Sequence, residues 1–91
     1  MPKIQQELMI SNELGLHARA SAKLVQAASK FRSEVSLCVG DEAVDAKSIL
    51  GVLTLAAVKG TPVVVIADGE DADGAISALT LLINDKFGEG K

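Results

Sequence analysis

Aromatic residues are almost absent from this chain, which has two phenylalanines and neither tyrosine nor tryptophan. Proteins that bind single-stranded nucleic acid stack bases on aromatic rings within a basic groove. Here nine basic residues stand against twelve acidic ones, for a formal net charge of −3. Both features argue against a nucleic-acid partner.

Cysteine, histidine and long apolar runs are equally scarce. Cys38 is alone, so no internal disulfide is possible, and we expect a cytoplasmic location. One histidine and one cysteine cannot supply the three or four ligands of a zinc site, so we expect neither metal nor cofactor. The longest wholly apolar run, residues 62–67, is far shorter than the roughly 18 residues of a membrane span. Residues 1–10 lack the pattern of a secretory signal.

The 91 residues, 48% of them hydrophobic, are enough for one aliphatic core, and we expect a single domain over residues 1–91. Apolar residues at every second position, with Gln6 as the one exception, predict a strand over residues 4–10, and the same alternation predicts another over 35–39. Gly40-Asp41 then forms a turn, and residues 43–46 are predicted to be a paired edge strand. A valine-rich run over residues 61–67 predicts a fourth strand, with Pro62 costing one hydrogen-bond donor near its start.

Apolar residues at helical spacing predict three helices. The first begins at Ala18 and ends near Lys30, and the second is capped by Ser48 and ends at Lys59-Gly60. The third carries its apolar face over residues 72–83. The order β-α-β-β-α-β-α indicates an α+β fold, with helices covering one face of a largely antiparallel sheet.

Three polar segments connect or end these elements. Residues 11–16 are expected to form an exposed loop, and Gly88-Glu89-Gly90-Lys91 a frayed tail. Residues 68–74 are acidic, but the fifth, sixth and twelfth positions counted from Asp68 do not fit the ligand pattern of an EF-hand. Acidic side chains at the start of the last helix explain this stretch more simply.

The most informative stretch is Gly15-Leu16-His17-Ala18-Arg19-Ala20, a turn that runs directly into a helix. A helix start has unpaired N–H groups and partial positive charge, which stabilise a phosphoryl group, and Arg19 adds a cation. Neutral imidazole is a competent nucleophile, and the ordinary pKa of histidine, about 6.5, leaves most of it neutral at pH 7. We interpret His17 as a phosphorylation site. The alternative is that it only caps the helix or faces solvent.

The sequence Leu-Gly-Leu-His-Ala-Arg resembles the active-site signature of HPr, the histidine-containing phosphocarrier family of the bacterial phosphoenolpyruvate-dependent phosphotransferase system (PTS). The resemblance covers essentially the whole chain. It implies an open-faced sandwich of four antiparallel strands with three helices on one side. It also implies that His17 is phosphorylated on its ring and that Arg19 neutralises the phosphoryl charge. Ala20 stands where the motif most often has proline, and alanine is also an excellent helix former.

A second motif, Ala46-Lys47-Ser48-Ile49-Leu50-Gly51-Val52, resembles the HPr segment whose serine is phosphorylated by a dedicated kinase in some bacteria. Phosphate on Ser48 would meet free N–H groups at the helix start. The alternative is that Ser48 only caps the helix. The short helix has more apolar residues than one buried face can use, so we expect Leu50 and Leu53 to be exposed. The resemblance implies that these positions contact the phosphate donor and acceptor proteins. The alternative is that both belong to the core.

The resemblance implies a monomeric phosphoryl shuttle, not an enzyme in its own right, that takes a phosphoryl group from enzyme I and passes it to enzyme II components. A different possibility is a regulatory module of a nitrogen-related or permease-free branch, in which the phosphorylation state is read and not delivered to sugar. Both predict phosphorylated His17.

Overall fold

The computed structural model describes residues 3–91, so the first two residues of the expected domain lie outside it. The elements follow one another in the predicted order, with one additional 3-10 turn, η1, after the last helix. The strands are β1 (Lys3–Met9), β2 (Glu34–Val39), β3 (Glu42–Asp45) and β4 (Pro62–Asp68). The helices are α1 (Ala18–Ala28), α2 (Ile49–Thr54) and α3 (Ala72–Asn84), followed by η1 (Lys86–Gly88).

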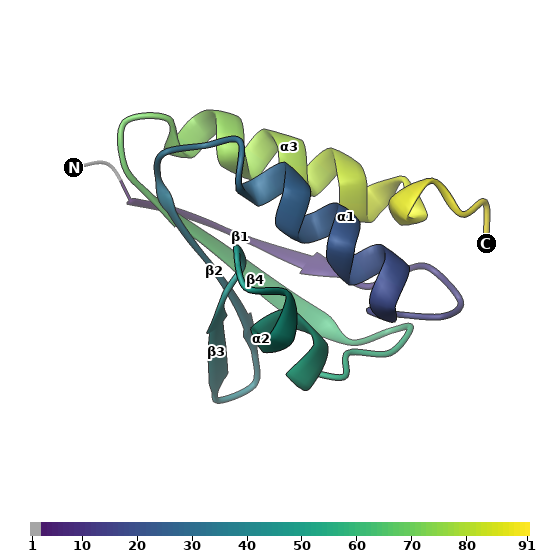
Figure 1. Cartoon of the computed structure of the whole chain (residues 1–91). Coiled ribbons are helices and arrows are strands. Elements are labelled where there is room, and N and C mark those ends of the chain that lie inside the picture. The colour runs from purple at the N-terminus through teal and green to yellow at the C-terminus, as the bar shows by residue number, and fades with distance from the viewer. Residues whose placement is uncertain (1–2) are drawn as a thin grey trace.

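The four strands form one antiparallel sheet in the order β1-β4-β2-β3, with the helices on one of its faces (Figure 1). Ala67 of β4 pairs with Ile4 on one side and Val35 on the other, so the inward-facing apolar rows of the strands are in register. Pro62 is the first residue of β4, where a missing donor is tolerated. The predicted α+β architecture is confirmed.

Helices α1 and α3 lie side by side over the sheet (Figure 1) and bury one apolar face each. The core is aliphatic apart from Phe87, which is fully buried although it follows α3. Cys38 is half-buried on β2. Over residues 3–91, no helix combines the length and apolar character needed to cross a membrane.

The second helix is shorter than predicted and ends at Thr54, not at Lys59-Gly60. Leu55 and Ala57 are buried although they lie in the following loop, and Ala56 has a left-handed backbone with φ of 49°. The apolar character of this stretch therefore reflects burial of a loop and not continuation of a helix. Two smaller corrections are that α1 ends two residues before Lys30 and that β3 lies one residue earlier than predicted.

The loop over residues 11–16 is not exposed as a whole, which corrects the prediction. Asn12, Gly15 and Leu16 are buried, whereas Glu13 and Leu14 face solvent. The Leu16 N–H donates to the Ala57 carbonyl at 2.9 Å, so this loop is fastened to the segment that follows α2. Segments far apart in the chain thus fix the backbone that leads to His17.

In the acidic stretch before α3, Asp73 lies in the first helical turn, as predicted. Asp71 instead accepts hydrogen bonds from the segment that follows α1. The Asp71 carboxylate accepts hydrogen bonds from the Arg32 N–H at 2.8 Å, the Ser33 N–H at 2.9 Å and the Ser33 hydroxyl at 2.5 Å. These bonds, with the hydroxyl contributing most, lower the pKa of Asp71 to about 2. Asp71 therefore ties the segment after α1 to the start of α3.

Candidate functional site

His17 is the N-cap residue of α1. Its backbone is extended, with φ of −74° and ψ of −179°, and its carbonyl accepts the Ser21 N–H at 2.9 Å. The ring nitrogen Nδ1 accepts the Arg19 N–H at 3.3 Å. The side chain of His17 thus satisfies one of the donors that every helix start leaves unpaired. Capping is therefore real at this position, and it aims Nδ1 at the positive end of α1.

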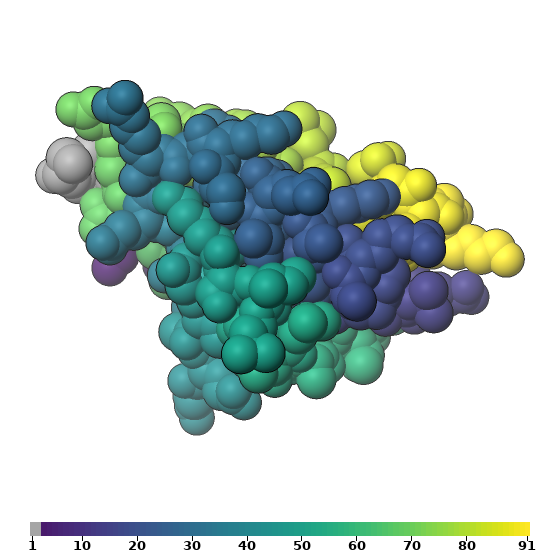
Figure 2. All heavy atoms as spheres, in the orientation of Figure 1, coloured from purple at the N-terminus to yellow at the C-terminus, as the bar shows by residue number. Residues whose placement is uncertain are grey.

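The other ring nitrogen of His17 meets the C-terminal tail. Nε2 lies 2.5 Å from Oε2 of Glu89, whose Oε1 accepts from the Asn12 amide at 2.9 Å. The same Asn12 nitrogen donates to the Gly15 carbonyl at 2.8 Å. Figure 2 shows the yellow tail packed beside the start of α1. The prediction of a frayed tail over residues 88–91 is wrong, because contacts with the site hold it in place.

Three features seat this tail. Phe87 is fully buried, and the Lys23 ammonium donates to its carbonyl at 2.6 Å. Lys86 and Phe87 both have left-handed backbones, with φ of 55° and 57°, which turn the chain back toward α1. Such a conformation is strained in a bulky residue, so burial of the ring must stabilise it. At the last residue, the Lys91 carbonyl accepts the Glu13 N–H at 3.0 Å.

The hydrogen bonds of His17 define one tautomer. The Arg19 N–H can only donate, so Nδ1 must carry a lone pair, and a carboxylate can only accept, so Nε2 must carry the proton. The ring that satisfies both bonds is neutral, with Nδ1 as its nucleophilic nitrogen. The His17 side chain is 28% exposed and Glu89 is 12% exposed, so the ring remains accessible while its carboxylate partner is largely covered.

Gly15 allows the chain to reach this geometry. Its φ of 65° favours glycine, and a Cβ there would overlap the Ala57 carbonyl oxygen and lie 2.9 Å from the Val58 Cα. Both neighbouring atoms belong to backbone, which cannot move aside cheaply. The glycine two residues before His17 is therefore required by close packing as well as by the turn.

Several charged side chains gather around Glu89, the partner of the His17 ring. Arg19, Lys23 and Lys91 line one shallow hollow together with Glu13 and Glu89. The pKa of Glu89 is held below its ordinary value, chiefly by the hydrogen bond from Asn12 and next by that from His17, with a smaller effect of the Lys23 charge. Glu89 is thus a carboxylate at neutral pH.

Glu89 was not among the predicted site residues. It stands between two glycines in a polar end segment, a pattern typical of disordered tails. The one available signal was Phe87, because a large aromatic residue so close to the tail has to be buried somewhere. His17 and Arg19, by contrast, lie together at the helix start as predicted, although Arg19 is exposed.

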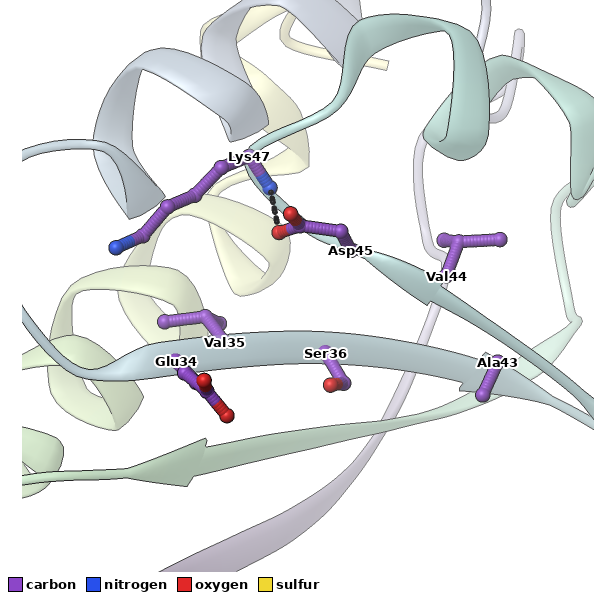
Figure 3. Close-up of a pocket in the computed structure, with 7 residues that line it drawn as sticks. All are labelled: Glu34, Val35, Ser36, Ala43, Val44, Asp45 and Lys47. Atoms are coloured by element: carbon purple, nitrogen blue, oxygen red, sulfur yellow. Dashed lines mark hydrogen bonds between the residues drawn. The ribbon is translucent and has the colours of Figure 1, made fainter.

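Ser48 caps α2 as predicted, its hydroxyl accepting the Gly51 N–H at 3.2 Å. The turn before it is tied by the Lys47 N–H to the Asp45 carboxylate, drawn as a dashed line in Figure 3, beside a hollow between β2 and β3. The Lys47 ammonium donates to the Phe31 carbonyl at 2.8 Å. Neither His17 nor Arg19 lines this hollow, so it is separate from the histidine site.

The apolar surface of α2 consists of Ile49, Leu50 and Leu53, which are 42%, 71% and 36% exposed. Val52 is buried and connects the helix to the core. The alternative that Leu50 and Leu53 both belong to the core is therefore wrong. Because α2 contacts α1, the helix that His17 caps, this apolar surface lies on the same side of the sheet as His17 (Figure 1).

Fold and site together define a small α+β protein. Its single histidine caps a helix, and one nitrogen of the neutral ring, Nδ1, carries a lone pair. A family model described as the phosphorylation site of the PTS HPr component matches residues 4–85. The phosphocarrier protein HPr of Neisseria meningitidis is 51% identical over 88 residues, covering 97% of this chain and 99% of that protein. The chain belongs to the HPr family.

Two further similarities extend this result. The phosphocarrier protein NPr of Shewanella violacea is 39% identical over 89 residues, covering 98% of both chains. The crystal structure of an HPr from Thermoanaerobacter tengcongensis superposes with a TM-score of 0.89 at 43% identity, again over 98% of both chains. The family and its fold are therefore supported independently by sequence and by structure.

Proposed function

We propose that this chain is a stoichiometric phosphoryl carrier of the phosphotransferase system, acting as one domain over residues 1–91. Nδ1 of His17 takes the phosphoryl group from phosphorylated enzyme I and passes it to an enzyme II component. The observation that carries the proposal is the single neutral tautomer of His17, which leaves the nucleophilic lone pair on Nδ1 at a helix start. The names of the most similar relatives support the same role.

The transfer is a displacement at phosphorus. The Nδ1 lone pair forms the new N–P bond, and the bond to the donor breaks with its electron pair leaving on the donor. The Arg19 N–H that had bonded Nδ1 can then bond a phosphoryl oxygen, and the Arg19 side chain adds charge from the edge of the hollow. Since the ring is partly exposed, a partner can approach it and remove the group again.

Partner docking is assigned to the apolar surface of α2. Leu50 and Leu53 provide exposed apolar side chains on a helix that packs against α1. Burial of such a surface against a partner would bring the partner's own phosphoryl-bearing group toward His17.

Regulation is assigned to Ser48, for which the resemblance to the kinase-modified segment is the support. A phosphate there would replace the hydroxyl as the acceptor at the start of α2 and add nearly two negative charges beside Leu50. The proposed modifying enzyme is an HPr kinase. Its effect on transfer would be exerted through docking, because Ser48 and His17 cap different helices.

The second candidate is a regulatory module of a nitrogen-related or permease-free branch. The observation that favours it is the NPr relative at 39% identity. The HPr-named relative is more similar, at 51%, so the sugar branch takes precedence. A transfer assay with enzyme II components of each branch distinguishes the two.

The decisive experiment is incubation with enzyme I and phosphoenolpyruvate, followed by mapping of the phosphate. We expect label on Nδ1 of His17, and complete loss of label in His17→Ala, with circular dichroism unchanged because the core lies elsewhere. Ser48→Ala is the control and should be labelled normally. Label that persists in the His17 variant would refute the proposal.

A further inference from the structure

The contact between Glu89 and His17 joins residues 72 positions apart and involves the one ring nitrogen that the transfer reaction does not use. Asn12 fixes the carboxylate from the opposite side. Its amide nitrogen faces two acceptors, the Gly15 carbonyl and Oε1 of Glu89, so the amide cannot be flipped without losing both bonds. Among the described residues, the buried Oδ1 of Asn12 is left without a partner in this orientation. Asn12 is thus committed to holding Glu89.

We infer that Glu89 is a positioning residue that keeps the proton on Nε2 of His17 throughout the phosphoryl cycle. This inference rests on the proposed carrier function and extends it. When Nδ1 forms its bond to phosphorus, the ring still carries the Nε2 proton and becomes a cation. The Glu89 carboxylate is the negative charge that faces this cation.

The consequence concerns the leaving group in the second transfer. An acceptor attacks phosphorus, the N–P bond breaks, and its electron pair returns to Nδ1. If Nε2 has kept its proton, the ring leaves as neutral imidazole. If Nε2 has lost its proton, the ring must leave as an anion, which is a far poorer leaving group. A carboxylate that holds the proton therefore keeps the phosphorylated protein ready to give up its cargo.

The charged groups near Glu89 determine how strongly its carboxylate holds the Nε2 proton of His17. Lys23, Arg19 and Lys91 are the cations in and around the same hollow, and Glu13 is the second acid. The Lys23 ammonium is engaged by the Phe87 carbonyl and does not bond Glu89 directly. The bonded partners of Glu89 are Asn12, which is neutral, and His17.

The test uses Glu89→Gln, which keeps the size of the side chain. Glutamine has one oxygen for the two donors that Glu89 serves, so it cannot accept from both Asn12 and the ring as the carboxylate does. Glu89→Ala removes both bonds. Glu13→Gln is the matched control, since it removes an acid from the same hollow without touching His17.

Each protein is phosphorylated chemically with phosphoramidate, so that the test does not depend on enzyme I. The chain has a single histidine, so its two ring nitrogens can be followed by ¹⁵N NMR without interference. In the phosphorylated wild-type protein and in Glu13→Gln, we expect the Nε2 proton to persist to higher pH than in the two Glu89 variants, by about one pH unit.

The rate of phosphoryl loss should diverge in the same way. At pH 8 the Glu89 variants should release the phosphoryl group to water more slowly than wild type, by up to about tenfold, because more of their Nε2 is deprotonated. At pH 6 we expect Nε2 to be protonated in every protein, so the rates should agree. A merely structural role would shift both rates together.

Equal loss of the Nε2 proton in wild type and variants, or a rate change of the same size at both pH values, would overturn the inference. Phosphate mapped to Nε2 would overturn it as well. Failure of enzyme I to label the wild-type protein would instead refute the carrier function, while the chemically phosphorylated protein would still report on Glu89.

Discussion

The first turns of α1 and α2 are both capped by a side chain, but the capping atoms differ in chemistry. At α1 the capping atom is Nδ1 of His17, and at α2 it is the hydroxyl of Ser48, with similar distances of 3.3 and 3.2 Å to the backbone N–H. His17 has a second partner, Glu89, that fixes its proton. A serine hydroxyl must lose a proton before it can attack phosphorus, and the Ser48 hydroxyl contacts a backbone N–H and not a base.

The two residues therefore differ as phosphoryl acceptors. The fold itself makes His17 nucleophilic, whereas Ser48 depends on another protein to become so. His17 needs a donor only, because the nucleophilic lone pair already exists. Ser48 needs a kinase that brings both the phosphoryl group and a base. The C-terminal tail also contacts the α1 start, whereas the α2 start leads into an exposed apolar surface.

Paired glycine substitutions test how rigidly the starts of α1 and α2 are held. We expect one of them to cause the largest change in the free energy of unfolding. Gly15→Ala forces a left-handed alanine into backbone atoms of residues 57 and 58, and should destabilise the protein by about 2 kcal/mol or more. Gly51→Ala brings a Cβ to 3.3 Å from Val44 of the edge strand while gaining helix propensity, so its effect should stay within about 1 kcal/mol. Urea denaturation of both variants makes the comparison, and equal losses would show that the two starts are equally rigid.

Ser48→Asp places a charge at the start of α2 and should weaken docking by about tenfold, because an approaching apolar face must desolvate the carboxylate. Aspartate keeps an acceptor for the cap, so stability should change little. Isothermal titration with enzyme I measures the affinity. Ser48→Ala is the control, losing about 1 kcal/mol of stability but keeping its affinity. Equal affinity of the Asp variant and wild type would remove α2 from the docking surface.

Arg19→Ala tests the charge at the α1 start and should slow transfer from enzyme I by about threefold to tenfold. The residual activity is expected because the N–H groups and the dipole of α1 remain. Rapid-quench labelling gives the rate. A loss as complete as that of His17→Ala would mean that the side chain, not the helix start, provides most of the stabilisation.

These starts were only partly predictable from sequence. The spacing of apolar residues is local information, so it located α1, the cap at Ser48 and the strands to within a few residues. The motif around His17 is local as well. Glu89 contacts His17 across 72 positions, and no periodicity encodes such a contact. The end of α2 was missed because Leu55 and Ala57 are buried by tertiary packing of a loop, which resembles a helical face when read as sequence.

A substitution at Asp71, beyond the far end of α1, serves as a reference. It should not affect the starts of α1 and α2, so we expect the smallest effect on phosphorylation here. The pKa of Asp71 is lowered from 3.8 to about 2, so its bonds to Arg32 and Ser33 add stability above pH 4. That contribution is lost as the pH falls from about 4 to 2. Relative to wild type, Asp71→Asn should lose stability at pH 5 and match it near pH 2, as measured by urea midpoints. Phosphorylation at neutral pH should not change.

The position of β4 has a consequence for how the chain folds. Strand β4 lies between β1 and β2, yet it is the last strand to be synthesised, and Lys3 at the start of β1 pairs with Asp68 at its end. The β2–β3 hairpin can pair earlier, but a two-stranded hairpin is marginally stable in water. On the ribosome, β1 must therefore wait until residues 62–68 have emerged. We therefore expect folding to be limited by closure of a long loop, and the sheet to form late.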